Sequence, residues 1–115
     1  MSIRRIKPNI RSERFKESRE FYRDVIGLTG GDGLDWILFF SSPDDPQLQL
    51  SVMLDVTAGI HPDVTVEVDD VEAVHARAVE AGAEIVHPLT HEPWDVRRFF
   101  VRDPNGAVIN IMEHR

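Results

Sequence analysis

Alternation of apolar and polar residues predicts strands over much of the chain. Val64-Thr65-Val66-Glu67-Val68 alternates cleanly, and residues 6–11 alternate around one proline. A period of two residues is typical of a strand with one buried face. The same reasoning predicts further strands at residues 36–40, 47–54, 96–102 and 107–112, with shorter ones near 28–29 and at 84–86.

Two segments instead repeat their apolar residues with the period of a helix. Residues 17–26 place an apolar stripe on one helical face and are followed by Gly27. Residues 71–81 do the same and are followed by Gly82. Glycine commonly ends a helix because it adopts the left-handed conformation without strain. Each predicted helix therefore has a clear end.

The order of these elements occurs twice along the chain. Each predicted helix follows one strand and precedes three, which gives two consecutive β-α-β-β-β units. One such unit alone is a small sheet with one helix, too little to be stable unpaired. We therefore predict an α+β fold in which residues 1–115 form one domain of two tandem modules. The module boundaries are expected at about residues 3–55 and 63–113, with a joint at about 56–62.

Alternation also separates two faces of each predicted sheet. Leu48, Leu50, Val52 and Leu54, and in the second module Val64, Val66, Val68, Ile109 and Ile111, are expected to pack against the helices. The opposite face carries Lys7, Asn9, Arg11, Gln49, Ser51, Met53, Asp63, Thr65, Glu67, Val108, Asn110 and Met112. Such a face is either simply exposed to water or lines a shared concavity. Its mixture of Met, Val and polar residues favours a ligand pocket.

Composition narrows the classes of partner. The 115 residues carry a net charge of −7, from 20 acidic against 13 basic side chains, which disfavours nucleic acid. The absence of cysteine excludes disulfides, thiolate nucleophiles and cysteine-type zinc sites. No apolar run approaches the roughly 18 residues of a membrane span, and the N-terminus lacks the apolar core of a signal peptide. We expect a cytoplasmic protein with no membrane partner.

Three motifs, taken together, resemble a known superfamily. They are Ser18-x-x-Phe21-Tyr22-x-x-Val25-x-Gly27-Leu28, then Val68-Asp69-Asp70-Val71 with Gly82, then residues 99–111 around Asp103-Pro104-Asn105-Gly106. They resemble the vicinal oxygen chelate superfamily, which includes glyoxalase I, ring-cleaving dioxygenases and bleomycin-resistance proteins. The resemblance covers essentially the whole chain. It implies a curved mixed sheet around a cleft, helices on the convex side, and often a homodimer.

The resemblance also bears on metal binding. Metal-dependent members of that superfamily hold a divalent ion with His and Glu side chains from four strand positions. Carried onto this chain, those positions hold Lys7, Gln49, Asp63 and Asn110. The family pattern DPxGNxIEL would place a glutamate at Asn110, and an ammonium such as Lys7 cannot coordinate a cation. A shift of two residues would replace Lys7 by Asn9 without restoring a site, so we expect no ordinary metal centre and no cofactor.

Histidines offer a second, less favoured metal reading. His87 and His91 are followed by Glu92, and His61 lies elsewhere in the chain. Ligands four residues apart converge on a helix, whereas the prolines at positions 88 and 93 indicate a loop. Histidines that merely contact water are the more common case in such loops.

One tryptophan and two arginines are candidate contacts for a ligand. Trp94, at a predicted loop–strand junction, either fills the core or lines the cleft, where its ring would stack on a planar or cationic molecule. Arg97 and Arg98 point to opposite faces if both lie on a strand, so one of them is expected near the cleft.

These observations favour a metal-free protein of the bleomycin-resistance type that sequesters a small, partly aromatic or cationic molecule. The predicted ligand-binding residues are Asn9, Gln49, Glu67, Trp94, Arg97, Asn110 and Met112. The alternative is an enzyme of the same superfamily (a lyase, isomerase or dioxygenase-like protein) that uses Asp63 or Glu67 as a general base or an atypical metal site through Asp63 or the histidines. A third hypothesis is an assembly module whose homodimer matters and whose cleft stays empty.

Overall fold

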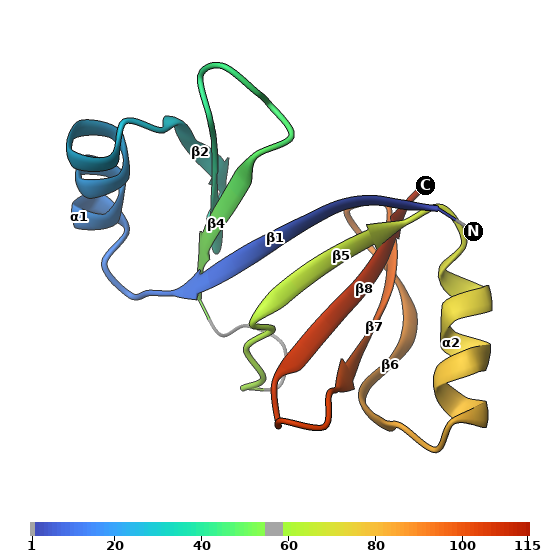
Figure 1. Ribbon diagram of the computed structural model, residues 1–115. Coiled ribbons are helices and arrows are strands. Elements are labelled where there is room, and N and C mark those ends of the chain that lie inside the picture. The colour runs from blue at the N-terminus through green and yellow to red at the C-terminus, as the bar shows by residue number, and fades with distance from the viewer. Residues whose placement is uncertain (1, 55–58) are drawn as a thin grey trace. The chain divides into compact units, whose positions relative to one another are not determined.

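The computed structural model describes residues 2–54 and 59–115. The α+β class and the twofold β-α-β-β-β order are confirmed (Figure 1). The elements are β1 (Ile3–Arg11), α1 (Phe15–Glu20), the π-helix η1 (Phe21–Ile26), β2 (Thr29–Leu34), β3 (Ile37–Ser41), β4 (Gln49–Met53), β5 (Val64–Val68), α2 (Val71–Glu80), β6 (Glu84–Glu92), β7 (Val96–Arg102) and β8 (Val108–His114).

The chain divides into two compact units. The N-terminal unit comprises Lys7–His61, and the C-terminal unit comprises Met1–Ile6 with Pro62–Arg115. Strand β1 therefore contributes its first part to one unit and its second part to the other. Positions 56–58 of the predicted joint lie outside the described residues. The cleft expected between the modules stays a prediction.

The C-terminal unit has a mixed sheet in the order β5-β8-β7-β6, in which β5 and β8 are parallel and the other pairs are antiparallel. Helix α2 packs on one face of this sheet (Figure 1). Val68, Val71, Phe99 and Ile111 are buried at the centre of that contact. Val66 and Ile109 pack against the same cluster, so the predicted helix-facing residues of this module are confirmed except for Val64, which is only half-buried.

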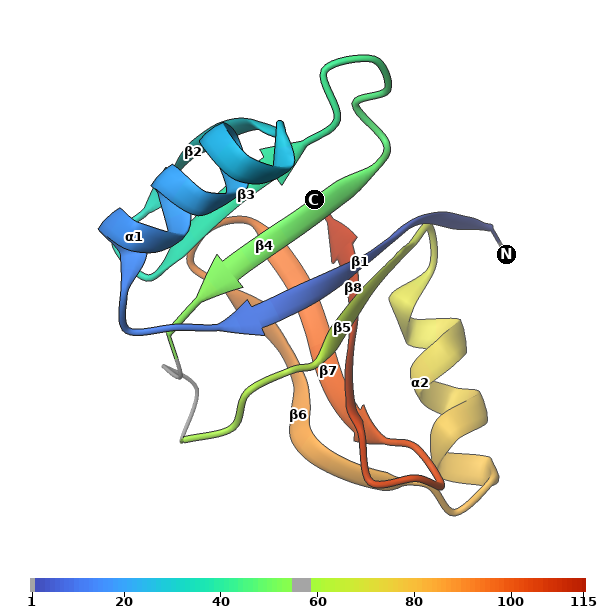
Figure 2. The same cartoon turned by 60° about the vertical axis from the view of Figure 1, so that its left-hand side comes forward.

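The N-terminal unit has the order β2-β3-β4-β1, in which β1 and β4 are parallel. The helical segment α1–η1 covers one face of it (Figure 2). Tyr22 meets Phe40 with ring centroids 5.3 Å apart, and Leu50 and Val52 join the same core as predicted. Leu48, also predicted to face the helix, is 62% exposed and precedes β4, so that prediction is wrong.

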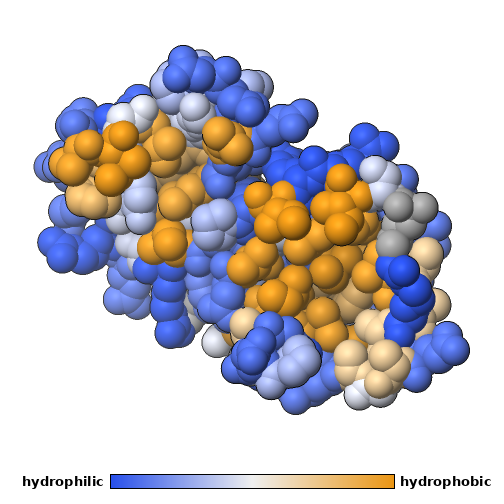
Figure 3. Space-filling model, in the orientation of Figure 1, coloured by the Kyte–Doolittle hydropathy of each residue, from blue (hydrophilic) through white to orange (hydrophobic). Residues whose placement is uncertain are grey.

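Each helical segment ends as its glycine predicts, with φ of 92° at Gly27 and 73° at Gly82. The first segment starts at Phe15, two residues before the predicted start, and its second half is a π-helix. Three apolar side chains of η1 remain exposed: Phe21, Val25 and Ile26. Figure 3 shows apolar surface over the region of this helical segment. No helix in the described part of the chain is long and apolar enough to cross a membrane.

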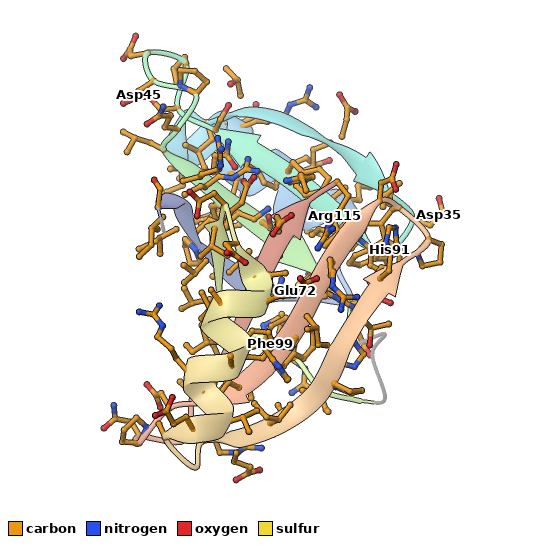
Figure 4. All side chains as sticks on the ribbon, turned by 90° about the vertical axis from the view of Figure 1, so that its right-hand side faces the viewer. Asp35, Asp45, Glu72, His91, Phe99 and Arg115 are labelled. Atoms are coloured by element: carbon orange, nitrogen blue, oxygen red, sulfur yellow. The ribbon has the colours of Figure 1, made fainter. Side chains whose placement is uncertain are left out.

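Two carboxylates, one adjacent to the helix and one from a distant strand, accept hydrogen bonds from backbone amides in the first turn of α2. Asp70 Oδ1 accepts a hydrogen bond from Ala73 N at 3.1 Å, and Glu113 Oε1 on β8 accepts one from Val71 N at 3.0 Å. Carboxylates satisfy exposed amides there and complement the positive end of the helix dipole. Glu72 instead points outward and binds Arg97 and Arg115 at 2.7 and 3.0 Å (Figure 4).

One expectation about the C-terminal unit is wrong. The segment predicted as a loop, from His87 to Glu92, belongs to β6, which pairs with β7 on both sides of Pro88. Pro88 is tolerated because β6 is an edge strand whose register shifts around it. At the C-terminal end of the chain, His114 ends β8, and its Nδ1 lies 2.9 Å from Glu67 Oε2.

Replacing Phe99 by alanine tests the assignment of the core. Its ring is fully buried between α2 and the sheet and contacts His75 edge-on at 4.9 Å. We expect Phe99→Ala to lower the free energy of unfolding by about 3–5 kcal/mol, because it removes a large apolar group and leaves a cavity. Denaturant titration followed by circular dichroism measures this. Val79→Ala, at a side chain that is 57% exposed, is the control, and equal losses for both variants would contradict the assignment.

Candidate functional site

The face of the C-terminal sheet that points away from α2 carries three of the predicted ligand-binding residues, Glu67, Asn110 and Met112. Its register places Thr65 opposite Asn110, and Asn110 opposite Phe100. We call this surface the polar face; it comprises Thr65, Glu67, His87, Glu92, Arg98, Phe100, Asn110 and Met112. Thr65, Glu67, Arg98 and Asn110 are each at most 8% exposed. Buried polar groups of this kind need hydrogen-bond partners.

Asn110 lies in the middle of this face with one of its two polar atoms satisfied. Its Nδ2 donates a hydrogen bond to Thr65 Oγ1 at 3.2 Å. Its Oδ1 is buried and has no hydrogen-bond partner among the described residues. Leaving a buried carbonyl unsatisfied costs about 1–3 kcal/mol. A ligand that donates a hydrogen bond at this point would recover that cost.

Glu67 lies at one end of the polar face inside an ion-pair cluster. Its carboxylate contacts the Arg5 guanidinium and lies 2.9 Å from His114 Nδ1. Burial alone would raise the pKa of Glu67, but the hydrogen bonds from His114 and Arg5 outweigh it and hold that pKa below its ordinary value. A carboxylate held in this way is a weak base. The role of general base that the sequence suggests for Glu67 is therefore not favoured by its surroundings.

A pocket of about 260 Å³ lies beside that cluster and is lined by Arg4, Glu67, Val68, Asp69, Glu113 and His114. The carboxylates in its wall already accept hydrogen bonds: Asp69 from Ser2 N at 2.7 Å and Glu113 from Val71 N at 3.0 Å. These acids therefore serve to join chain segments. The pocket therefore arises where these segments pack together, and the carboxylates in its wall are already engaged.

The other end of the polar face is organised by a buried arginine. Arg98 is 4% exposed and directs its guanidinium to Glu92 Oε2 at 2.6 Å, while its carbon Cζ lies 4.7 Å from the Phe100 ring centroid. Burial lowers the pKa of Arg98, and the pair with Glu92 partly opposes that effect. His87 Nε2 lies 3.5 Å from the same Glu92 oxygen, too far for a hydrogen bond. Burial, helped by the Arg98 charge, lowers the pKa of His87, so the imidazole is neutral near pH 7.

The structure gives the positions of Trp94, Arg97 and Arg98, which the sequence left open. Trp94 lies in the turn between β6 and β7, is 39% exposed, and has the Arg98 guanidinium 5.2 Å from its ring centroid. Arg97, named above as a ligand-binding residue, lies on the α2 side and donates to Glu72 at 2.7 Å. Arg98 is therefore the arginine of the polar face. The expected opposition of the two side chains is confirmed, and a ligand contact by Arg97 stays a prediction that its pairing with Glu72 does not favour.

Asp63, the other candidate base, joins two strands at their ends. Its Oδ2 accepts a hydrogen bond from Val108 N at 2.8 Å, and its own N–H donates to Val108 O at 2.8 Å. The register places Thr65, and not Asp63, opposite Asn110. This position suits a structural clamp between β5 and β8. Met112 is 8% exposed and stands between Glu67 and Arg98 in the register.

In the N-terminal unit, the predicted residues lie on the face away from α1. The register pairs Asn9 with Ser51, and Ser51 with Phe39. Lys7 is 7% exposed, and its Nζ lies 4.6 Å from the Phe39 ring centroid. Gln49 donates through Nε2 to Pro46 O at 2.8 Å and thereby closes the turn before β4. Ser51 Oγ is fully buried and has no hydrogen-bond partner among the described residues.

These surroundings do not fit the metal ion that the four strand positions would hold. Lys7 brings a buried ammonium, Gln49 is engaged in a turn, Asp63 holds backbone of β8, and Asn110 is an uncharged amide. Divalent ions need several anionic or imidazole donors converging. Across the described residues, no three His, Asp or Glu side chains come together in a way that could hold a metal ion.

Sequence reasoning did not single out Arg98, Glu92 or Ser51 as site residues, although it placed Ser51 on the face of its strand that points away from the helix. Arg98 was visible only as one of two adjacent arginines, and alternation along β7 could not say which of them faces α2. Glu92 was hidden because Pro88 and Pro93 made its segment resemble a loop. Ser51 had a usable signal, since it lies between Gln49 and Met53 on the predicted polar face of β4.

Comparison with known proteins adds a family and a fold. The family model described as Glyoxalase/Bleomycin resistance protein/Dioxygenase superfamily matches residues 5–111. No curated protein matches the sequence significantly. A superfamily member from Vibrio splendidus 12B01 is similar in structure, with a TM-score of 0.74 and 18% identity over 97% of this chain and 99% of that chain.

Two further solved structures are also similar. Methylmalonyl-CoA epimerase from Mycobacterium tuberculosis has a TM-score of 0.69 and 15% identity, over 98% of this chain and 87% of that one. The Mn(II)-bound glyoxalase from Novosphingobium aromaticivorans has a TM-score of 0.64 and 18% identity, over 96% of this chain and 38% of that one. At such identities these likenesses concern the fold alone.

The lowered pKa of His87 predicts a pH dependence of stability. Because the unfolded chain binds a proton near pH 6.5 more readily than the folded chain, the contribution of His87 is fully present above that pH. Stability is then lost as the pH falls below about 6.5. We expect acidification from about pH 7.5 to 5.5 to lower the melting temperature of the parent protein by roughly 2–4 °C more than that of His87→Gln.

Thermal unfolding followed by circular dichroism at the two pH values measures this difference. His91→Gln is the matched control, because its imidazole side chain is 53% exposed and lies on the same strand. The assignment of His87 as a buried neutral group fails if His91→Gln flattens the pH dependence and His87→Gln does not.

Proposed function

Because this chain belongs to the glyoxalase/bleomycin resistance protein/dioxygenase superfamily, we propose that it is a metal-independent member that binds and sequesters a small, partly aromatic molecule. The ligand donates a hydrogen bond to Asn110 on the polar face. The single observation that carries this proposal is the buried Asn110 Oδ1 without a hydrogen-bond partner. Buried acceptors without a hydrogen-bond partner are rare in folded proteins. A bound ligand that donates a hydrogen bond would satisfy this one.

The charged groups near Asn110 are already paired with one another, which supports an uncharged hydrogen-bond donor as the ligand group that Asn110 binds. Glu67 is held by Arg5 and His114, and Glu92 is held by Arg98. Charges that are already paired offer little to an incoming ion, because a new contact must first break an existing one. The amide oxygen of Asn110 carries no such cost. A hydrogen-bond donor on the ligand is therefore the group most readily accepted there.

An aromatic body for the ligand is supported by the residues around Asn110. Phe100 and Met112 lie on the same face, and the ring of Trp94 is 39% exposed at its end. Flat side chains and thioether groups of this kind bind planar apolar molecules well. The Arg98 guanidinium already stacks near Trp94 and Phe100, which disfavours a cationic ligand beside them.

The rival is an enzyme of the same superfamily with a carboxylate as general base. The lowered pKa of Glu67 and the clamp made by Asp63 give that hypothesis no support of its own. A sequestering protein needs affinity alone, and no activated base or nucleophile is required of it. Metal content and ligand binding distinguish the enzyme from the sequestering protein.

Metal content is the first test. We expect purified protein to contain less than about 0.1 equivalent of divalent metal, and EDTA to leave its melting temperature unchanged, since the four strand positions lack converging donors. Elemental analysis and native mass spectrometry measure metal, copurified ligand and subunit number together, and a homodimer is expected. Near-stoichiometric metal that stabilises the protein would support the enzyme and contradict sequestration.

Hydrogen bonding to Asn110 is the second test. Indole and phenol donate a hydrogen bond, whereas N-methylindole and anisole have nearly the same ring without that donor. We expect indole and phenol to raise the melting temperature more than their methylated counterparts in differential scanning fluorimetry. The reason is that only the donors satisfy the buried oxygen, an effect worth about fivefold to tenfold in affinity.

Variants assign that preference to one residue. In Thr65→Val/Asn110→Leu both partners of the buried hydrogen bond become apolar, so the fold should be kept and the preference lost. Asn105→Ala, in the exposed turn before β8, should keep the preference. Equal stabilisation by donors and methylated compounds in the parent protein would overturn the proposal.

A further inference from the structure

An imidazole held by a buried carboxylate lines the pocket beside Glu67. His114 Nδ1 lies 2.9 Å from Glu67 Oε2. The carboxylate side chain is 11% exposed, whereas the imidazole is 54% exposed and forms part of the pocket wall together with Arg4. From this juxtaposition we infer that the pocket of about 260 Å³ binds a small oxyanion, a carboxylate or a phosphate, between the His114 imidazolium and the Arg4 guanidinium.

The contact with Glu67 fixes which nitrogen of His114 serves a ligand. An ionised carboxylate only accepts hydrogen bonds, so the imidazole donates to it from Nδ1. The second nitrogen, Nε2, is then the one left for a molecule in the pocket that His114 lines. A neutral ring offers a lone pair at Nε2, and a protonated ring offers an N–H donor there. Only the protonated ring can therefore bind an anion.

Glu67 keeps its negative charge while the imidazole gains or loses a proton. Burial alone would raise the pKa of Glu67, but the hydrogen bonds from His114 and Arg5 hold that pKa below its ordinary value. The carboxylate therefore stays ionised at about pH 6 and above. Histidine is the side chain that ordinarily changes charge between about pH 5 and 8. A change in the charge of this cluster near neutral pH thus comes from the imidazole.

The charges around the pocket balance before His114 is protonated. Each carboxylate in the pocket wall already meets one arginine: Glu67 meets Arg5, Glu113 meets Arg115, and Asp69 meets the charge of Arg4. Arg115 also reaches Glu72, but that carboxylate has Arg97 as a second partner. Protonation of His114 therefore gives the pocket one positive charge in excess. An oxyanion is the ligand that neutralises it.

Arg4 supplies the second contact for the ligand. It is exposed on β1 and lines the same pocket as His114. A guanidinium has five N–H donors in a planar fork, which matches two oxygens of a carboxylate or a phosphate. The pocket volume of about 260 Å³ suits such a group with a short body, for which Val68 offers an apolar wall.

His91, labelled in Figure 4, provides a matched control. Its imidazole is 53% exposed, and its Nε2 lies 3.3 Å from Asp95 Oδ1. That carboxylate is itself 76% exposed, and neither residue lines the pocket. Exposed ion pairs contribute little because water and salt screen them. A role that depends on the pocket and on the buried carboxylate should therefore belong to His114 and not to His91.

Sulfate, acetate and acetamide are suitable probes, because the charges of the first two do not change between about pH 6 and 8 and acetamide is an uncharged analogue of acetate. In NMR titrations of the histidine side chains at fixed ionic strength, we expect both anions to bind at least about fivefold more tightly at about pH 6 than at about pH 8. Acetamide should bind more weakly than acetate and show no such dependence. Tighter binding of sulfate indicates a phosphate as the ligand group, and tighter binding of acetate indicates a carboxylate.

Variants assign the site to its two cations. His114→Gln keeps a donor for Glu67 and removes the titrating ring, so the dependence on pH should be lost and sulfate should bind about fivefold more weakly at about pH 6. Arg4→Met, at an exposed residue, should weaken both anions by about threefold or more at either pH. His91→Gln should change neither result. Melting temperatures without added anion show whether each variant keeps the fold.

Equal sulfate binding at the two pH values in the parent protein would overturn the inference. A dependence on pH that His91→Gln abolishes and His114→Gln keeps would do the same. The inference goes beyond the role proposed for Asn110 and does not rest on it. Sulfate binding can depend on His114 when indole and N-methylindole bind alike, and the reverse result would leave the Asn110 proposal standing alone.

Discussion

Coverage of one sheet face by a single helical segment is the constraint on which the rest of this structure depends. In the C-terminal unit α2 buries Val71 against Phe99 and Ile111, and in the N-terminal unit Tyr22 packs on Phe40. Apolar side chains that alternate along the strands satisfy this contact. Every second residue is then directed to the opposite face, where the two modules differ from ordinary wetted sheets because polar groups there are buried.

Burial makes each polar group on that face costly unless it has a partner, and the protein meets this cost in two ways. Charged groups are joined into compact pairs, such as Glu92 with Arg98 and Glu67 with Arg5 and His114. Neutral groups are satisfied less completely, as the Asn110 oxygen and the Ser51 hydroxyl show among the described residues. Each of these two residues has a phenylalanine as its register partner, Phe100 for Asn110 and Phe39 for Ser51.

Membership of a superfamily that contains enzymes does not by itself imply that this chain is a catalyst. The superfamily fold supplies four strand positions suited to metal ligands, but the chemistry depends on the side chains placed there. In this chain those positions hold an ammonium over an aromatic ring and an amide hydrogen-bonded to a threonine, neither of which is an anionic metal ligand. The same backbone can thus serve recognition in one member and metal chemistry in another, such as the Mn(II)-bound glyoxalase.

The sequence by itself determined the class of fold, the two repeats, the helix ends at Gly27 and Gly82, and which residues of β5 and β8 face α2. These follow from local periodicity and from the conformational freedom of glycine, which neighbouring residues reveal. Tertiary structure alone decided that β6 continues past Pro88, that His114 binds Glu67 from 47 positions away, and that Arg98 and not Arg97 lies on the polar face. Those outcomes depend on strand register and on edge position, which are set by contacts between segments distant in the chain, and no local pattern encodes them.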